Sequence, residues 1–234
     1  MKKILCLIPA RSGSKGLKDK NIRDFKGKPL IAHSILQAKQ CDFVDSMRII
    51  VTTDSKNYAE VAKKYGAEVP FIRPANLSQD LSTDLEFMKH AVNWLKEYEN
   101  YEADIILQLR PTQPLRKIED INKTMRLFIE NYDHYDSLRT VIEFEKSPYK
   151  MYRINNNILE PLFNSVDDIS NEPYNQCRQN LPTTYLHNGY IDILKTSILE
   201  KDKISGSKIL PYIMNKEDTI DIDTEEDWIN AILQ

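Results

Sequence analysis

The residues best suited to chemistry in this chain lie between positions 11 and 28, directly after an apolar run. Seven basic side chains in this stretch accompany only two acidic ones, although the whole chain has a formal net charge of −3. Arg11 and Lys15 can donate charge-assisted hydrogen bonds to an anion, and Gly13 and Gly16 let the backbone approach a ligand and turn its N–H groups inward. This composition favours a phosphate-binding loop; a solvated basic turn is the alternative.

The position of the loop supports the phosphate interpretation. Residues 4–8 form a short apolar run, typical of a strand that is buried on both faces of a parallel sheet, and Pro9 ends it. Ligands of open α/β sheets bind at the carboxyl ends of the strands. The loop matches neither G-x-x-x-x-G-K-[ST] nor G-x-G-x-x-G, so it is not one of the two commonest nucleotide-binding signatures.

A second chemical signal is the acidic pair Asp221 and Asp223. Alternation with two isoleucines predicts a strand with both carboxylates on one face. Two like charges held so close need a cation, and magnesium bridging carboxylate and phosphate oxygens fits this need. The alternative is a helix start, because Asp223 or Thr224 could form a cap with Glu226. Both interpretations can hold, one residue apart.

The elements that would position these residues alternate between apolar strands and amphipathic helices. This alternation is typical of an α/β fold with a mostly parallel sheet, here one domain with an insertion. Helices are predicted at residues 29–40, 57–65 and 118–130, after the caps at 80–83, and near the C-terminus; strands are predicted at 22–25, 47–53, 69–72, 104–109, 137–144 and 209–214, with a hairpin around 146–157.

Composition excludes several classes of protein. The chain is 41% hydrophobic and 29% charged with a pI near 5.9, which gives no support for nucleic-acid binding. No apolar run approaches the length of a membrane span, and we expect a cytoplasmic protein. The three cysteines form no C-x-x-C pair and the four histidines lack metal-ligand spacing, so neither a disulfide framework nor a zinc site is expected.

Three segments together resemble a known family: Ile-Pro-Ala-Arg-Ser-Gly-Ser-Lys-Gly-Leu at 8–17, Lys-Asn-Ile at 20–22 and Gly-Lys-Pro-Leu at 27–30. They are similar to the opening of the acylneuraminate cytidylyltransferases, the CMP-sialic acid synthetase family. The resemblance covers essentially the whole chain. It implies a three-layer Rossmann-like nucleotidyltransferase fold over residues 1–234, with a mostly parallel sheet and a small dimerisation insertion at 146–184.

The resemblance implies that CMP passes from CTP to the anomeric hydroxyl of a nonulosonic, nine-carbon keto sugar acid, with release of pyrophosphate. Its catalytic residues would be Arg11, Lys15, Asp221 and Asp223, the two aspartates as ligands of Mg²⁺. The segments Arg-Pro-Ala-x-Leu and Asp-x-Ser-Thr would lie by the cytosine; without the family, Arg73 would be read as a surface charge. The nucleotide-binding residues would be Arg11, Ser14, Lys15, Gly16, Asn21, Arg73, Ser82 and Thr83.

The chain departs from its family on the acceptor side. Arg110 and Gln113 stand where the family usually carries glutamine and serine, and Asp192 stands where it usually carries tyrosine. We expect Arg110 to pair with the acceptor carboxylate or to reach a triphosphate oxygen. Asp192 would pair with Arg110 or accept hydrogen bonds from the sugar, and Asn188 belongs to the Asn-Gly turn that enters the same strand.

The insertion carries two further predicted site residues, Lys150 and Arg178. They match the Pro-x-Lys and Arg-Gln-x-Leu-Pro segments through which the family forms dimers and completes its site, so we expect a homodimer.

Two other functions stay open. One is a nucleotidyltransferase of the same fold with another acceptor, an eight-carbon keto acid or a sugar phosphate. The other is a non-catalytic nucleotide-binding relative. No residue stands out as a general base.

Overall fold

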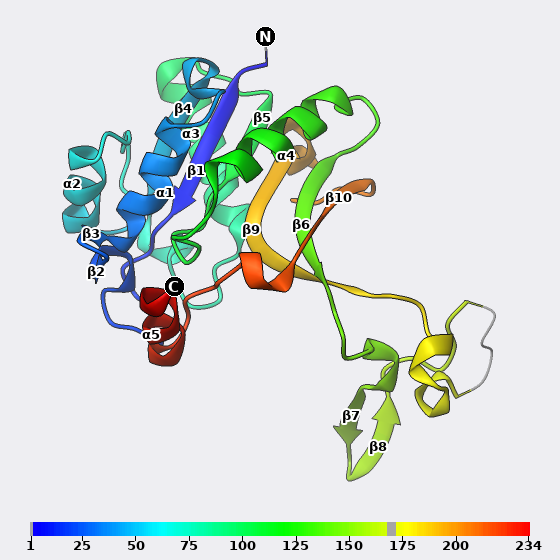
Figure 1. Ribbon diagram of the computed structural model, residues 1–234. Helices are drawn as coiled ribbons and strands as arrows, with labels where there is room; N and C mark the ends of the chain where they lie inside the picture. Colours follow the sequence, from blue (N-terminus) through cyan, green and yellow to red (C-terminus); the bar gives the residue numbers. More distant parts are fainter. Residues whose placement is uncertain (1, 168–171) are drawn as a thin grey trace.

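A six-stranded mixed sheet forms the centre of the computed structural model, which describes residues 2–167 and 172–234. The strand order is β10-β6-β9-β5-β1-β4, and every neighbouring pair is parallel except the two pairs that include β9 (Figure 1). The strands are β1 (Ile4–Pro9), β4 (Met47–Thr52), β5 (Ile105–Gln108), β6 (Ser137–Glu143), β9 (Tyr185–Lys195) and β10 (Ile209–Met214).

Helices cover both faces of the sheet, so the predicted three-layer α/β fold is confirmed. Because side chains alternate along a strand, Cys6 points into one apolar layer and Leu5 and Leu7 into the other. The first layer contains α1 (Leu30–Lys39), α2 (Lys56–Lys64) and α4 (Ile118–Glu130); the second contains α3 (Asp84–Glu99) and the 3₁₀ helix η7 (Thr196–Lys201). None of the helices in the described ranges is long and apolar enough to cross a bilayer.

The predicted strand at 69–72 is wrong. Only Glu68 bridges to β4, at Ile50, and the chain then runs irregularly to the 3₁₀ helix η3 (Ala75–Leu77). Pro70 lies inside this segment and Pro74 follows it, and because proline has no N–H it cannot donate to a sheet ladder. The predicted strand at 22–25 is only partly formed, as the 3₁₀ helix η1 (Lys20–Ile22) followed by β2 (Asp24–Phe25), which pairs with β3 (Lys28–Pro29).

The insertion between β6 and β9 projects away from the sheet (Figure 1). It contains the predicted hairpin, β7 (Tyr152–Asn155) and β8 (Ile158–Pro161), whose two turn residues Asn156 and Asn157 have positive φ, as hairpin turns of two residues favour. Its other elements are the 3₁₀ helices η4 (Pro148–Lys150), η5 (Pro173–Asn175) and η6 (Arg178–Asn180).

The acidic pair, Asp221 and Asp223, lies in an irregular segment and not in the predicted strand. Residues 219–223 form no strand, although Ile222 is buried and both aspartates face solvent, as the alternation requires. The backbone N–H of Ile222 donates to the carbonyl of Thr112, and no ladder extends this bond. Thr224 then caps α5 (Glu225–Leu233); the remaining 3₁₀ helices are η2 (Val44–Ser46) and η8 (Lys216–Asp218).

Candidate active site

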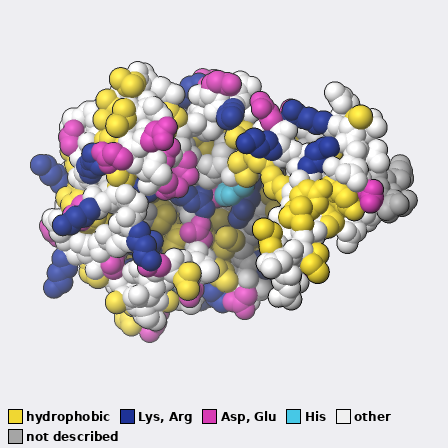
Figure 2. Space-filling view, turned by 90° about the horizontal axis from the view of Figure 1, so that it is seen from below, with side chains coloured by type: hydrophobic (Ala, Val, Ile, Leu, Met, Phe, Trp, Pro, Cys, Tyr) yellow, Lys and Arg dark blue, Asp and Glu magenta, His cyan; other side chains and the backbone are white. Residues whose placement is uncertain are grey.

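Two pockets lie at the carboxyl ends of the central strands, and Arg110 lines both. Pocket A, of about 220 Å³, is lined by Pro9, Arg11, Ser14, Lys20, Asn21, Arg73, Ser82, Asp84, Phe87, Arg110, Pro111 and Thr112. Pocket B, of about 510 Å³, is lined by Arg110, Gln113, Ile142, Leu186, His187, Asn188, Gly189, Lys216, Thr219 and Asp221. Figure 2 shows acidic, basic and histidine side chains gathered in the hollow of this face, between the body and the insertion.

The two cations predicted to bind phosphate converge on one anion. Arg11 Nη1 lies 2.8 Å from Asp80 Oδ1, and Lys15 Nζ lies 2.5 Å from Asp80 Oδ2. Lys15, followed by Arg11, holds the pKa of the Asp80 carboxyl below its usual range. A single carboxylate therefore satisfies both side chains, and a phosphate group with the same charge geometry can take its place.

The loop that carries these cations is held by its own polar side chains. Asn21 Nδ2 donates to the carbonyl of Arg11 at 3.0 Å, and Ser12 donates through its backbone N–H and its hydroxyl to Asp54. A Cβ on Gly16 would lie 2.4 Å from the carbonyl oxygen of Asp223, so only glycine allows the loop to approach the acidic segment this closely. Gly16 thus brings the basic loop and the acidic pair together.

Arg73 is buried at the back of pocket A, so the alternative of a surface charge is wrong. Its Nε donates to the Thr52 hydroxyl at 3.1 Å and its Nη2 to the Thr52 carbonyl, and its guanidinium lies 5.0 Å from the centre of the Phe87 ring. Burial lowers the pKa of Arg73 to about 10. A fixed guanidinium beside an aromatic ring offers hydrogen-bond donors and a planar wall to a flat ligand.

Of the two predicted hydroxyl residues before α3, only Ser82 lines pocket A. Its Oγ accepts from the backbone N–H of Gln79 at 2.9 Å. Thr83 caps α3 through a capping box with Glu86. Thr83 therefore fixes the end of the helix that presents Asp84 and Phe87 to the pocket.

The acidic pair lies against the basic loop. The Asp221 side chain reaches solvent, but the protein around it partly desolvates its carboxyl and raises its pKa, and the charge of Asp223 acts in the same direction. Lys20, which the sequence reasoning did not select, donates to the Ile222 carbonyl at 2.8 Å and to Asp223 Oδ1 at 2.9 Å. Within residues 2–167 and 172–234 no group of three or more acidic, histidine or cysteine side chains forms a complete metal cage.

Arg110 is the centre of an ion-pair network between the pockets. Its Nη2 lies 2.7 Å from Asp84 Oδ2, and its Nη1 lies 2.5 Å from Asp192 Oδ2. Burial raises the pKa of Asp192, but hydrogen bonds and charge from His187 and Arg110 outweigh it and hold the value at about 2. We expected Asp192 either to pair with Arg110 or to accept hydrogen bonds from the sugar, and the structure contains the pair with Arg110.

The remaining predicted acceptor residues occupy two different places. Asn188 lines pocket B, where its Oδ1 accepts from the Thr140 hydroxyl at 2.6 Å, and its carbonyl accepts from Gln113 Nε2 at 3.0 Å. Lys150 and Arg178 lie on the insertion, and Lys150 Nζ donates to the Gln176 carbonyl at 2.6 Å. Neither lines pocket A or B.

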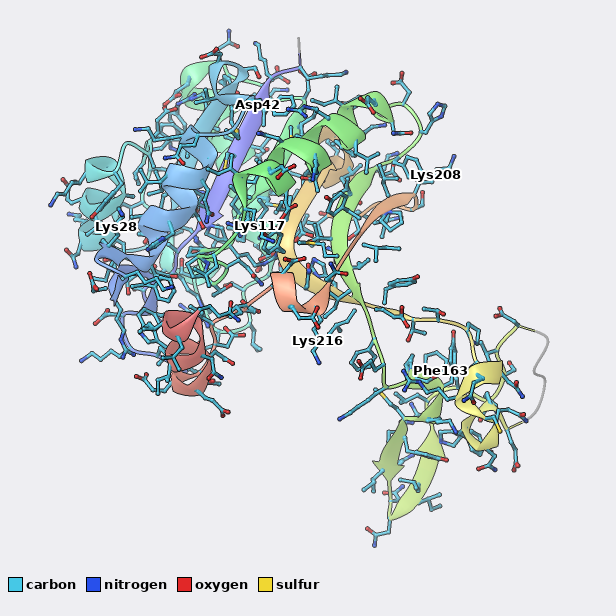
Figure 3. The ribbon with its side chains drawn as sticks, viewed as in Figure 1. Lys28, Asp42, Lys117, Phe163, Lys208 and Lys216 are labelled. Carbon is cyan, nitrogen blue, oxygen red and sulfur yellow. The ribbon has the colours of Figure 1, made fainter. Side chains whose placement is uncertain are left out.

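Figure 3 labels Phe163 on the insertion and Lys216, which lines pocket B, beside the central sheet. The two residues lie apart in this view. The basic loop, the acidic pair and the Arg110 network therefore form one site, and the insertion of the same chain stands apart from it.

Two solved structures share this architecture. The CMP:2-keto-3-deoxy-manno-octonic acid synthetase complexed with CTP superposes with a TM-score of 0.68 at 16% identity, covering 99% of this chain and 97% of that one. A 4-diphosphocytidyl-2C-methyl-D-erythritol synthase gives 0.62 at 13% identity, covering 100% and 99%. The fold is therefore that of the nucleotidyltransferases.

The sequence identifies the family within that class. The profile of the family described as Cytidylyltransferase matches residues 5–190, and the chain belongs to this family. It is 35% identical to the CMP-N,N'-diacetyllegionaminic acid synthase of Legionella pneumophila, over 97% of this chain and 93% of that protein. It is 34% identical to the N-acylneuraminate cytidylyltransferase of Escherichia coli, over 98% of this chain but only 51% of that protein, so it spans about half the length of this relative.

Proposed function

We propose that this protein transfers CMP from CTP to the anomeric hydroxyl of a nonulosonic keto sugar acid and releases pyrophosphate. The observation that carries the proposal is the junction of the two pockets at Arg110, with the convergent cations Arg11 and Lys15 on one side and a polar pocket on the other. Family membership and relatives named for sialic, legionaminic and pseudaminic acids support this choice of substrates.

Pocket A would hold CTP. Arg11, Lys15 and Ser14 would bind the triphosphate after Asp80 gives up its two cations, and Asn21 would keep the loop in place. The cytosine would lie near the buried Arg73, whose fork can donate to the base oxygen and ring nitrogen, and against Phe87. Because the charge on the phosphates builds as pyrophosphate leaves, Lys15 and Arg11 would act most strongly in the transition state.

Asp221 and Asp223 would hold Mg²⁺. Magnesium in nucleotide sites takes one or two carboxylates, with phosphate oxygens and water completing its octahedron, so two neighbouring exposed carboxylates beside the loop fit this ion without a protein cage. When bound, the ion polarises the α-phosphate and lowers the pKa of the attacking hydroxyl. Lys20, paired with Asp223, would set the position of that carboxylate.

Pocket B would hold the sugar acid. The anomeric oxygen attacks the α-phosphorus at the junction, the bond to the bridging oxygen of the β-phosphate breaks, and pyrophosphate leaves with that electron pair. Catalysis of this kind depends mostly on positioning and on stabilisation of charge. Arg110 has more N–H donors than its pairs with Asp84 and Asp192 use, so it can also bind the acceptor carboxylate.

The insertion at 146–184 would form a homodimer interface. Its described residues include large apolar side chains that are open to solvent, namely Ile154, Ile158, Leu159, Leu162 and Phe163. Figure 2 shows this apolar patch beside the hollow. Such a patch on a small projecting element marks a binding surface. In the dimer, Lys150 and Arg178 would reach the pocket B of the other protomer.

We place the reaction in the cytoplasm. All three cysteines, at positions 6, 41 and 177, are free thiols, as expected in a reducing compartment.

Two alternatives to this function remain. Arg110 and Asp192 depart from the pattern of the sialic acid enzymes and favour another acceptor, such as an eight-carbon keto acid or a sugar phosphate. A non-catalytic relative would need neither the intact loop cations nor the acidic pair.

One panel distinguishes these functions. Pyrophosphate release is measured from CTP, UTP, ATP and GTP, each with Mg²⁺ and with N-acetylneuraminic, N,N'-diacetyllegionaminic, pseudaminic or 2-keto-3-deoxy-manno-octonic acid. We expect release only with CTP and a nine-carbon acid. Release with the eight-carbon acid alone, or only when a sugar phosphate replaces the acid, would establish the first alternative. No release with any of these acceptors would favour the second.

A further inference from the structure

His187 and Asp192 form a dyad on the wall of pocket B. The ring Nε2 lies 2.7 Å from Asp192 Oδ1. The aspartate side chain is only 6% exposed, whereas the histidine side chain is 31% exposed and lines the pocket. The carboxylate is therefore fixed inside the protein, and the ring that it orients is open to a ligand.

The hydrogen bond determines which ring nitrogen is free. Burial favours the neutral form of Asp192, but His187 and Arg110 together hold its pKa at about 2, so the carboxylate is ionised and only accepts. The neutral ring must then carry its proton on Nε2 and present the lone pair of Nδ1. Among the residues that the structure describes, Nδ1 has no hydrogen-bond partner.

The dyad lies next to the junction of the pockets. The same carboxylate that accepts from His187 through Oδ1 accepts from Arg110 through Oδ2, so one carboxylate group separates the ring from the guanidinium. Arg110 lines both pockets, and Asp221 lines pocket B with His187. A ligand in pocket B therefore shares that pocket with the open ring, which one carboxylate separates from the arginine at the junction.

We propose that His187, oriented by Asp192, accepts the proton of the acceptor hydroxyl as it attacks the α-phosphorus. This inference rests on the proposed cytidylyl transfer and adds the general base that the sequence did not reveal. The new bond joins the anomeric oxygen to phosphorus, and the bond from phosphorus to the bridging oxygen breaks. The electron pair of that bond leaves with pyrophosphate, and the proton passes from the hydroxyl to Nδ1 and then to water.

The surrounding charges permit the ring to take up a proton. Asp192 stabilises the imidazolium directly, and the positive and negative groups that face the dyad from the neighbouring elements nearly balance. These groups are Arg110 after β5, Arg139 on β6 at 3.9 Å from Asp192 Oδ1, Lys216 on η8, Asp84 on α3 and Asp221 in the C-terminal segment. The protonated ring is therefore an intermediate state that the pocket tolerates.

The test compares His187→Gln with the matched control His134→Gln. His134 is exposed on the turn after α4 and lines neither pocket. The assay follows pyrophosphate release from CTP with N-acetylneuraminic acid, or with whichever acid of the panel the unmodified protein uses. We expect His187→Gln to lose about 10²–10⁴ in kcat, with little change in the KM for CTP, and the control to keep full activity.

Two further readouts separate a proton acceptor from a residue that only shapes the pocket. The acid limb of the kcat profile should disappear in His187→Gln, because the variant has no ring to protonate. Added imidazole should restore part of the rate of His187→Ala. Should His187→Gln melt more than about 10 °C below the unmodified protein, His187→Asn replaces it, because this change leaves the pair of Asp192 with Arg110 in place, and it should lower kcat in the same way.

The outcomes are distinct. Wild-type kcat in His187→Gln, or a lower kcat with an unchanged acid limb and no rescue by imidazole, would overturn the role of the dyad. If the unmodified protein releases no pyrophosphate with any acid of the panel, the proposed function fails first. An active unmodified protein with a fully active His187→Gln variant refutes this inference alone.

Discussion

Replacing Arg110 with glutamine should destabilise the protein in a way that depends on pH. In the native protein the pKa of Asp192 is about 2 instead of 3.8, a difference worth about 2.5 kcal/mol in favour of the folded state at neutral pH. Because this pKa is lowered, the contribution is complete above about pH 4 and is lost as the pH falls toward 2. Arg110 supplies a large part of it, and its side chain is largely sheltered from solvent.

Without the guanidinium, burial would raise the pKa of Asp192 unopposed except by His187 and the more distant Arg139. We expect Arg110→Gln to lose about 2–3 kcal/mol at pH 7.5, which lowers Tm by roughly 5–10 °C. At pH 4 the carboxyl of the variant is already partly protonated, so the loss of unfolding free energy should be smaller than at pH 7.5 and should shrink further toward pH 2.

Urea unfolding at pH 7.5 and pH 4 measures both numbers. The matched control is Arg139→Gln, because Arg139 Nε lies 3.9 Å from the same carboxylate and should contribute under about 1 kcal/mol. If Arg110→Gln loses the same free energy of unfolding at the two pH values, the loss does not come from the ionised Asp192, and this reasoning is refuted.

In kinetics, the same variant should raise the KM for the sugar acid and leave the KM for CTP nearly unchanged. The reverse result would place Arg110 in the nucleotide site.

The remaining predictions concern the metal, the loop and the insertion. Asp223→Asn should abolish turnover with little loss of Tm, because one oxygen ligand is lost at constant volume, and a variant with wild-type rate and magnesium dependence would remove the metal assignment. Lys15→Ala and Arg11→Ala should each lower kcat by about 10²–10³ and barely change Tm, since both pair with Asp80 in surface ion pairs. Parallel losses in rate and melting would favour a solvated turn. Sedimentation should show a dimer that Ile154→Glu dissociates, with loss of activity, and a fully active monomer would contradict it.

The fold could largely be predicted from the sequence because its strands are short apolar runs. Ile4 to Ile8 needs burial on both faces, and only a sheet covered by two layers of helices provides this. The errors fall where local pattern and tertiary pairing disagree. Residues 220–223 alternate like a strand, but no neighbouring strand pairs with them beyond the bond from Ile222 to Thr112.

The site could be predicted only where a motif carried it. The loop after β1 and the acidic pair were found because unusual charge lies in a few consecutive residues. The partners of these groups were not, because Asp80 meets Arg11 across 69 positions and Lys20 meets Asp223 across 203. No local spacing indicates such contacts. The burial of Arg73 was equally hidden, since an arginine in an irregular segment usually faces solvent.

The most direct test of the proposed reaction is ³¹P NMR of CTP incubated with the protein, Mg²⁺ and a nine-carbon keto sugar acid. We predict that the triphosphate resonances disappear while one phosphodiester and one pyrophosphate form in equal amounts, and that omission of the acid stops the change. Formation of CDP and inorganic phosphate, or of free CMP with no phosphodiester, would contradict cytidylyl transfer to a sugar hydroxyl.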